Sequence, residues 1–227
     1  MIVGFDKKII VIKSPKTASS SLELWFSERL FGTRFVGDNP ELQPFVDGRG
    51  IATRSGHTPR LRFEIPPHTT LRGARDLLGK ETFHSFRKVT SVRNPFDQVV
   101  SFFWWRLARR NPSARAKLAD ASEKVRKKFF SKMLDEPLPD WLRLRHYVSL
   151  DGAGVDVDNV LRYETLADDL AKLSSELFGT SVGVELPRAK SNSRPSATSY
   201  RVYYSNSDRR KVEAQFAWEL ETFRYSF

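Results

Sequence analysis

The chain has 227 residues, of which 40% are hydrophobic; 38 are Lys or Arg and 27 are Asp or Glu, so the formal net charge is +11. This length and apolar content suit a single globular domain over residues 1–227. The sequence contains no cysteine, which excludes disulfides, zinc–thiolate sites and cysteine nucleophiles and favours a reducing compartment. The start MIVGFDKK lacks the apolar stretch of a signal peptide, and no segment approaches about 18 consecutive apolar residues. We therefore expect a cytoplasmic protein without a transmembrane segment.

The positive charge is clustered in the middle of the chain. The cluster comprises Arg106, Arg109, Arg110, Arg115, Lys117, Lys124, Arg126, Lys127 and Lys128. A surface of this kind favours a polyanionic ligand, which includes nucleic acid, an acidic glycan, an anionic lipid surface or a multiply charged cofactor.

Residues 9–31 predict a strand, a tight turn and a helix. Four apolar residues at positions 9–12 suit a strand buried on both faces, and Ser14-Pro15-Lys16-Thr17 forms the turn. The helical face consists of Leu22, Trp25, Phe26 and Leu30. A helix N-terminus attracts anions through its N–H groups and dipole, and here Lys16 adds a full positive charge. Hydroxyl donors are contributed by Thr17, Ser19, Ser20 and Ser21.

The turn lacks the glycines of a Walker A loop, GxxxxGK[ST]. Instead, Pro15-Lys16-Thr17 followed by Ala18 and three serines resembles the first cofactor motif of the sulfotransferases. In that family this loop holds the 5′-phosphosulfate of 3′-phosphoadenosine 5′-phosphosulfate (PAPS). By itself the loop is equally compatible with a lysine on an ordinary strand-to-helix turn.

Residues 32–56 show no sustained period and predict a long loop, which ends at Gly56-His57. A short helix closed by Gly79 follows at about 71–78. A second buried strand is predicted at 86–93. Asn94 then caps a strongly amphipathic helix, with Pro95 at its first position and Asp97 in its first turn. The apolar stripe of this helix is Phe96, Val99, Val100, Phe103, Trp104 and Leu107.

A basic helix is predicted at about 113–134, followed by a shorter helix at 141–147 and a third strand at 159–164. The inward face of the basic helix should hold Leu118, Val125, Phe129 and Met133. A helix ended by Gly179, a loop at 187–206 and a last helix capped by Ser207 complete the chain. Because strands alternate with helices, we predict an α/β fold with a central parallel sheet flanked by helices.

Arg93 ends the second strand, and Ser101 lies about 9 Å along the following helix. An arginine leaning along that helix could share one phosphate with the serine hydroxyl, although a loop arginine and a helix serine also occur without function. The run Arg93-Asn-Pro-Phe-Asp-Gln-Val-Val-Ser101 resembles the second sulfotransferase cofactor motif, in which these two residues hold the 3′-phosphate of PAPS. Two such motifs in this order identify the chain as similar to the sulfotransferases, whose fold is P-loop-like.

The resemblance extends to Tyr163-Glu164-Thr165-Leu166, which is similar to the YExL segment of the family, and to residues 192–227. It is nearest to the carbohydrate branch, which includes Golgi-type and bacterial enzymes. That branch implies sulfation of a hydroxyl acceptor, with a glycan as the first candidate, and no metal. It also implies that Lys16 is catalytic and that His57, in a Gly-His turn between the motifs, is the base; His84 and Glu64 are the reserve candidates.

The basic loop at residues 188–194 resembles the loop that closes over the cofactor in this family. The resemblance makes Lys190 and Arg194 cofactor contacts, although these cations, with Arg188, could equally lie on the surface or meet an acidic acceptor.

Two other functions compete with a sulfotransferase. The first is a P-loop kinase or NTPase, whose magnesium ligand would be nearest to Glu164. The second is a basic nucleic-acid-binding module, which the net charge and the Trp104-Trp105 pair favour; we expect no nucleic-acid partner, because those tryptophans fall in or beside a core stripe.

Overall fold

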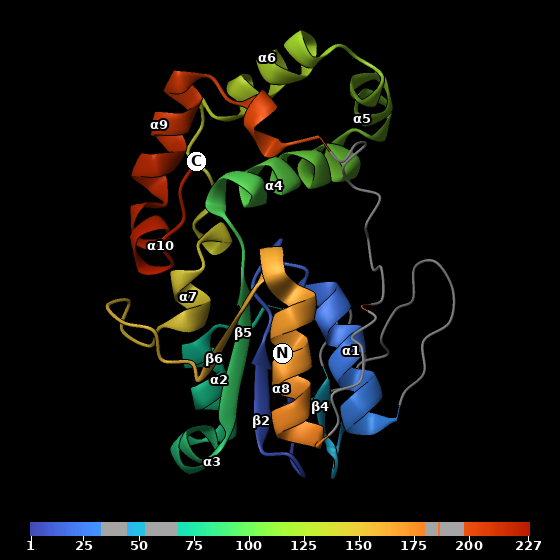
Figure 1. The fold of residues 1–227 in the computed structure, drawn as a ribbon, viewed down its shortest axis with the longest axis vertical. Helices are drawn as coiled ribbons and strands as arrows, with labels where there is room; N and C mark the ends of the chain where they lie inside the picture. Colours follow the sequence, from blue (N-terminus) through green and yellow to red (C-terminus); the bar gives the residue numbers. More distant parts are fainter. Residues whose placement is uncertain (33–44, 53–67, 180–185, 187–197) are drawn as a thin grey trace. The chain divides into compact units, whose positions relative to one another are not determined.

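The structure is a computed structural model that describes residues 1–32, 45–52, 68–179, 186 and 198–227 (Figure 1). These residues form two compact units. Unit 1 comprises Met1–Val92 and Leu144–Ala189, and unit 2 comprises Arg93–Arg143 and Lys190–Phe227. The expectation of a single domain stays a prediction. No described helix is both long and apolar enough to cross a membrane.

Unit 1 is built on a six-stranded open sheet among the described residues, in the order β3-β4-β1-β2-β5-β6. The strands are β1 (Ile2–Gly4), β2 (Ile9–Ile12), β3 (Phe45–Asp47), β4 (Gly50–Ala52), β5 (Arg87–Val92) and β6 (Asn159–Arg162). Strands β2, β5 and β6 run parallel, with Ile12 opposite Thr90. The pairs β1–β2, β1–β4 and β3–β4 are antiparallel.

The predicted α/β class is confirmed. The predicted central parallel sheet is right only for β2, β5 and β6, because the sheet as a whole is mixed. Tight turns at residues 5–8 and 47–50 make the β1–β2 and β3–β4 pairs antiparallel, because a tight turn can join only antiparallel strands. Strands β1, β3 and β4 have three residues each, too few to show a period of two. Two of them fall inside the segment 32–56 that the sequence predicts to be a loop.

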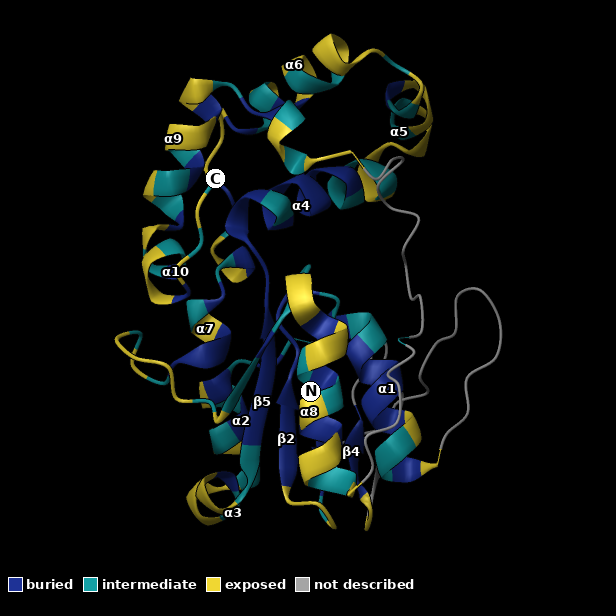
Figure 2. Ribbon diagram, viewed as in Figure 1, coloured by how far each residue is buried: buried dark blue, intermediate teal, exposed yellow. Residues whose placement is uncertain are grey.

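Helices cover both faces of the sheet (Figures 1 and 2). Alternating residues of β2 explain this: Ile9 and Val11 enter the core with α1 and α8, whereas Ile10 and Ile12 enter the core with α2 and α3. The helices of unit 1 are α1 (Ser19–Phe31), α2 (Leu71–Leu78), α3 (Lys80–Ser85), α7 (Arg145–Val148) and α8 (Leu166–Phe178), with a 3₁₀ turn η2 (Tyr163–Thr165). Gly179 ends α8 with a φ of 70°, as predicted.

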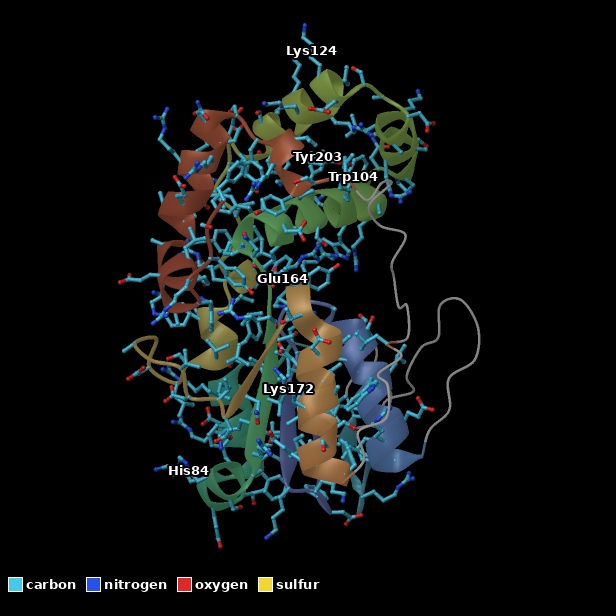
Figure 3. The ribbon with its side chains drawn as sticks, viewed as in Figure 1. His84, Trp104, Lys124, Glu164, Lys172 and Tyr203 are labelled. Atoms are coloured by element: carbon cyan, nitrogen blue, oxygen red, sulfur yellow. The ribbon has the colours of Figure 1, made fainter. Side chains whose placement is uncertain are left out.

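Unit 2 is helical in its described part. Its elements are α4 (Pro95–Arg110), α5 (Pro112–Ala119), α6 (Glu123–Met133), η1 (Asp140–Leu142), η4 (Tyr200–Tyr203), α9 (Asn206–Gln215) and α10 (Ala217–Thr222). The predicted stripe of α4 is its core: Trp104 is fully buried and its Nε1 donates to the Tyr203 hydroxyl at 3.0 Å (Figure 3). The Tyr204 hydroxyl donates to the carbonyl of Phe96 at 2.8 Å, which ties the C-terminal segment to α4.

Three helix predictions for residues 113–227 are wrong in detail. The basic helix predicted at 113–134 is broken at residues 120–122, and the break rotates α6 so that Phe130 is buried while Val125 and Phe129 are exposed. The predicted 141–147 helix is instead two short elements, the 3₁₀ turn η1 in unit 2 and the four-residue helix α7 in unit 1. The last helical segment is capped by Ser205 rather than by Ser207, because Ser205 and Asp208 form a capping box and α9 begins at Asn206.

Candidate functional site

The first motif lies where β2 ends and α1 begins. Lys16 and Ala18 have φ values of 63° and 64°, in the left-handed region that side chains with a Cβ rarely adopt. Left-handed residues in such a turn direct successive N–H groups into a concave, anion-binding arrangement. Strained backbone of this kind persists only where the surrounding structure enforces it, and it is common at functional sites.

Helix α1 leaves its first turn open to an anion. Ala18 is the N-cap, and no side chain of the described residues caps the helix through it; the first turn of α1 also contains no acidic residue. The first N–H groups of a helix have no carbonyl partner inside the helix, and the helix dipole makes this end positive. Ser19 is buried, whereas Lys16, Ser20 and Ser21 are half-buried. The predicted residues are therefore gathered around one positive helix end.

A buried cluster of hydroxyls holds this turn in place. Thr17 Oγ1 lies 2.8 Å from Ser14 Oγ and 2.7 Å from Ser91 Oγ. Ser14 Oγ also donates to the carbonyl of Ser91 at 2.5 Å, and all three side chains are fully buried. The sequence predicts that the Thr17 hydroxyl donates a hydrogen bond to an anion, but in the structure this hydroxyl is bonded within the buried cluster. Thr17 would therefore meet an anion through its backbone N–H.

A buried ion pair supports the other side of the turn. Lys13 is 2% exposed, and its Nζ lies 2.5 Å from Oε1 of Glu23 on α1. Burying two charges is favourable only with close geometry, so the pair holds the start of α1 against the end of β2. This pair was not predicted, although the sequence contains its signal, a lysine directly after a buried strand and a glutamate on the buried face of the next helix.

His68 also lies beside the turn. Its Nδ1 is 2.8 Å from the carbonyl oxygen of Lys13. A carbonyl only accepts, so Nδ1 carries the proton and Nε2 is the basic nitrogen of the neutral ring. The His68 ring packs edge-on against the ring of Tyr147, with 6.4 Å between the ring centroids. Burial raises the pKa of Tyr147 to about 12. The sequence analysis did not consider His68, whose place follows from the pairing of distant segments.

The second motif begins directly after β5, the parallel neighbour of β2. Arg93 is 7% exposed, and its guanidinium donates from Nε and Nη2 to Oδ2 of Asp97 at 2.8 and 2.6 Å. The sequence analysis used Asp97 only as a first-turn residue, although the four-residue spacing is that of a helical ion pair. Asp97 therefore fixes the orientation of the arginine that the resemblance assigns to a phosphate.

Asn94 and Ser101 complete the second motif. As predicted, Asn94 caps α4: its side chain accepts from the Phe96 N–H at 3.0 Å. Its Nδ2 also donates to the carbonyl of Ser226 at 2.9 Å. Ser101 follows Asp97 by one helical turn and is 8% exposed, so Asp97 and Ser101 share a face of α4.

Several predicted site residues lie outside the described residues, namely His57, Glu64, Arg188, Lys190 and Arg194. The reserve base His84 is described: it is exposed on α3, which directly precedes β5 (Figure 3). It therefore lies at the amino end of β5, whereas the first motif follows the carboxyl end of the parallel strand β2. This position is wrong for a base that acts at the turn.

Comparisons of the chain with protein-family models, with curated proteins and with solved structures found no match. The likeness to the sulfotransferases therefore rests on the motifs.

Proposed function

We propose that this protein is a sulfotransferase that moves a sulfuryl group from PAPS to a hydroxyl group. The observation that carries the proposal is the turn of the first motif. Lys16 and Ala18 adopt left-handed backbone at the positive end of α1, within a sequence that resembles the 5′-phosphosulfate loop of the family. Ligands of open α/β sheets bind beyond the carboxyl ends of the strands, and both motifs follow such ends.

The proposed roles follow the two motifs. Lys16 and the backbone N–H groups of residues 17–21 bind the 5′-phosphosulfate, with hydroxyls of the serines as further donors. Arg93, oriented by Asp97, and Ser101 bind the 3′-phosphate. Lys190 and Arg194 are proposed to close over the nucleotide. The protein fold proposed with this assignment is the P-loop-like sulfotransferase fold.

The reaction breaks the bond between sulfur and the bridging oxygen of PAPS and forms a bond between sulfur and the acceptor oxygen. Its products are 3′,5′-ADP, a sulfate ester and the acceptor proton, which passes to His57 as the proposed base. Negative charge grows on the leaving phosphate oxygen, where the Lys16 ammonium offsets it. As in phosphoryl transfer, in-line positioning and charge stabilisation supply most of the catalysis.

The proposed acceptor is a carbohydrate hydroxyl, from the resemblance to the carbohydrate branch. The net charge of +11 favours an acceptor that is itself anionic. The nucleic-acid alternative is weakened because Trp104 is buried and its indole N–H is bonded to Tyr203, so this ring has no face for base stacking.

A ligand-stabilisation experiment tests the nucleotide assignment. At about 100 times its dissociation constant, 3′,5′-ADP should add near 2.7 kcal/mol to the free energy of unfolding, a rise in melting temperature of about 5–10 °C. Magnesium-ATP and a short oligonucleotide should stabilise the protein much less. Equal stabilisation by magnesium-ATP would favour the kinase alternative, and stabilisation by the oligonucleotide alone would favour a nucleic-acid-binding module. Transfer of label from PAPS to a panel of glycans then identifies the acceptor.

A further inference from the structure

Helix α6 presents an exposed face that combines cations with apolar side chains. Its members are Lys124, Val125, Lys128, Phe129 and Lys132, which together cover about 140° of the helix circumference. Val125 is 40% exposed and Phe129 is 50% exposed, whereas Phe130 on the other side is fully buried in the core of unit 2. Figure 3 shows Lys124 extending from α6 into solvent. We call these five residues the α6 face.

The charge of this face is not neutralised within the described part of the chain. No hydrogen bond or ion pair of the described residues involves the side chains of Lys124, Lys128 or Lys132. By contrast, Lys211 meets Asp135 at 2.8 Å. The one acidic residue of α6 is Glu123, in its first turn. The α6 face is therefore positively charged, with an apolar pair one helical turn apart.

We propose that the α6 face docks on the headgroup region of an anionic lipid bilayer. Phenylalanine and valine enter the boundary between headgroups and acyl chains, while lysines extend their apolar stems and leave their ammonium groups among the lipid phosphates. Lysine suits this environment because its compact charge does not require the bidentate geometry that favours arginine. Each lysine near such a surface strengthens binding, and salt weakens it.

Two other occupants fit less well. A second copy of this chain, docked α6 to α6, would bring lysines against lysines. A soluble polyanion would neutralise the lysines but would leave Phe129 in water, so it accounts for only half of the face. An anionic bilayer accommodates both kinds of side chain at once. This inference is independent of the proposed sulfotransferase activity.

The test is sedimentation of the full chain with vesicles of phosphatidylcholine alone or with 30% phosphatidylserine. The wild type should bind the anionic vesicles and should dissociate from them as the salt concentration rises. The Lys124→Gln/Lys128→Gln variant should bind them about 30-fold more weakly. Its matched control is Lys80→Gln/Lys172→Gln, which removes two exposed lysines from unit 1 and should retain most of the binding.

The apolar half of the face is tested by Phe129→Gln, which should weaken vesicle binding about ten-fold. Its control is Leu77→Gln, at an apolar residue 37% exposed on α2, which should bind as the wild type does. Equal binding to neutral vesicles, or equal losses in the α6 variants and their controls, would overturn the proposal. The proposal would also be overturned if the lysines were needed for binding to soluble heparin while Phe129→Gln bound vesicles as tightly as the wild type does.

Discussion

The hydroxyl of Thr17 lies 2.7 Å from the hydroxyl of Ser91, and both side chains are fully buried. This contact joins the turn of the first motif to β5, whose last residue, Val92, directly precedes Arg93. The turn is therefore held from two sides, by the hydroxyl cluster and by the Lys13–Glu23 pair. Such support explains how two left-handed residues persist at the start of α1.

Thr17→Val tests the hydroxyl cluster. The substitution keeps the shape of the side chain but removes Thr17 as the partner of the Ser91 hydroxyl and as one of the two partners of the Ser14 hydroxyl. It should therefore lower the free energy of unfolding by about 1–3 kcal/mol. Urea unfolding measures this loss, and isothermal titration should also show weaker binding of 3′,5′-ADP. Thr222→Val, at an exposed position of α10, is the matched control and should change neither quantity. Unchanged stability of Thr17→Val would mean that the cluster does not support the turn.

Ala18→Gly tests the backbone strain of the turn. Glycine adopts left-handed backbone without a steric penalty, so this variant should be more stable than the wild type by about 1 kcal/mol, with 3′,5′-ADP binding retained. The control is Ala116→Gly, in the interior of α5, where the same change should cost about 1 kcal/mol. Thermal unfolding distinguishes the expected stabilisation by Ala18→Gly from the expected destabilisation by Ala116→Gly. Destabilisation by both substitutions would contradict the strained geometry.

The Arg93–Asp97 pair determines how the second motif must be tested. Arg93→Ala would remove the ion pair from Asp97, whose side chain is 14% exposed, and should destabilise the protein by about 1–3 kcal/mol, which confounds a binding measurement. Arg93→Lys keeps the charge and loses the two-donor geometry, so it should weaken 3′,5′-ADP binding about 10- to 100-fold in a folded protein. Ser101→Ala should weaken it about five-fold.

If Arg93 and Ser101 hold the same phosphate, the loss of 3′,5′-ADP binding free energy in the Arg93→Lys/Ser101→Ala double variant should differ from the sum of the two single losses. The control is Ser207→Ala, in the first turn of α9, which should bind as the wild type does. Strictly additive losses, or normal binding by Ser101→Ala, would make the serine a structural residue of α4.

The alkaline stability of unit 1 should depend on Tyr147. Burial raises the pKa of its hydroxyl from 10.0 to about 12, so the folded state holds this proton more tightly than the unfolded state. The resulting stability is complete below pH 10 and is lost as the pH rises from 10 towards 12. Tyr147→Phe lacks this ionisation, and its free energy of unfolding should fall less than that of the wild type over that window. Urea unfolding between pH 10 and 12 measures the difference, and an equal fall in the free energy of unfolding of both proteins would contradict the assignment.

The elements that surround the two motifs could be predicted from the sequence because each has strong local signals. Residues 9–12 are continuously apolar, and Asn94-Pro95 combines a cap with a favoured first residue, so β2 and the start of α4 are confirmed. The break at residues 120–122 was missed because no glycine or proline marks it and the basic stretches on its two sides, up to Lys117 and from Lys124 on, were joined into one helix. The available signal was Ser122, a residue type that favours the N-cap of a new helix.

The side-chain partners of the site were harder to predict. The contacts of Thr17 with Ser91 and of His68 with Lys13 join residues more than 50 positions apart, so they depend on strand pairing rather than on local pattern. Asp97 was the exception, since its spacing from Arg93 is a local signal. The proposed base His57 and the cations Lys190 and Arg194 stay predictions.

The last prediction separates Lys16 from the histidines. Lys16→Ala removes charge from the leaving oxygen, so it should lower turnover by orders of magnitude and also weaken PAPS binding. His57→Ala should leave 3′,5′-ADP binding intact and lower the rate about 100- to 10,000-fold, and the acid limb of the pH–rate profile should disappear. His84→Ala, on the opposite edge of the sheet, is the control and should keep normal turnover. If His57→Ala is active while His68→Ala loses the acid limb, the base is His68, whose Nδ1 is already held by the Lys13 carbonyl beside the turn.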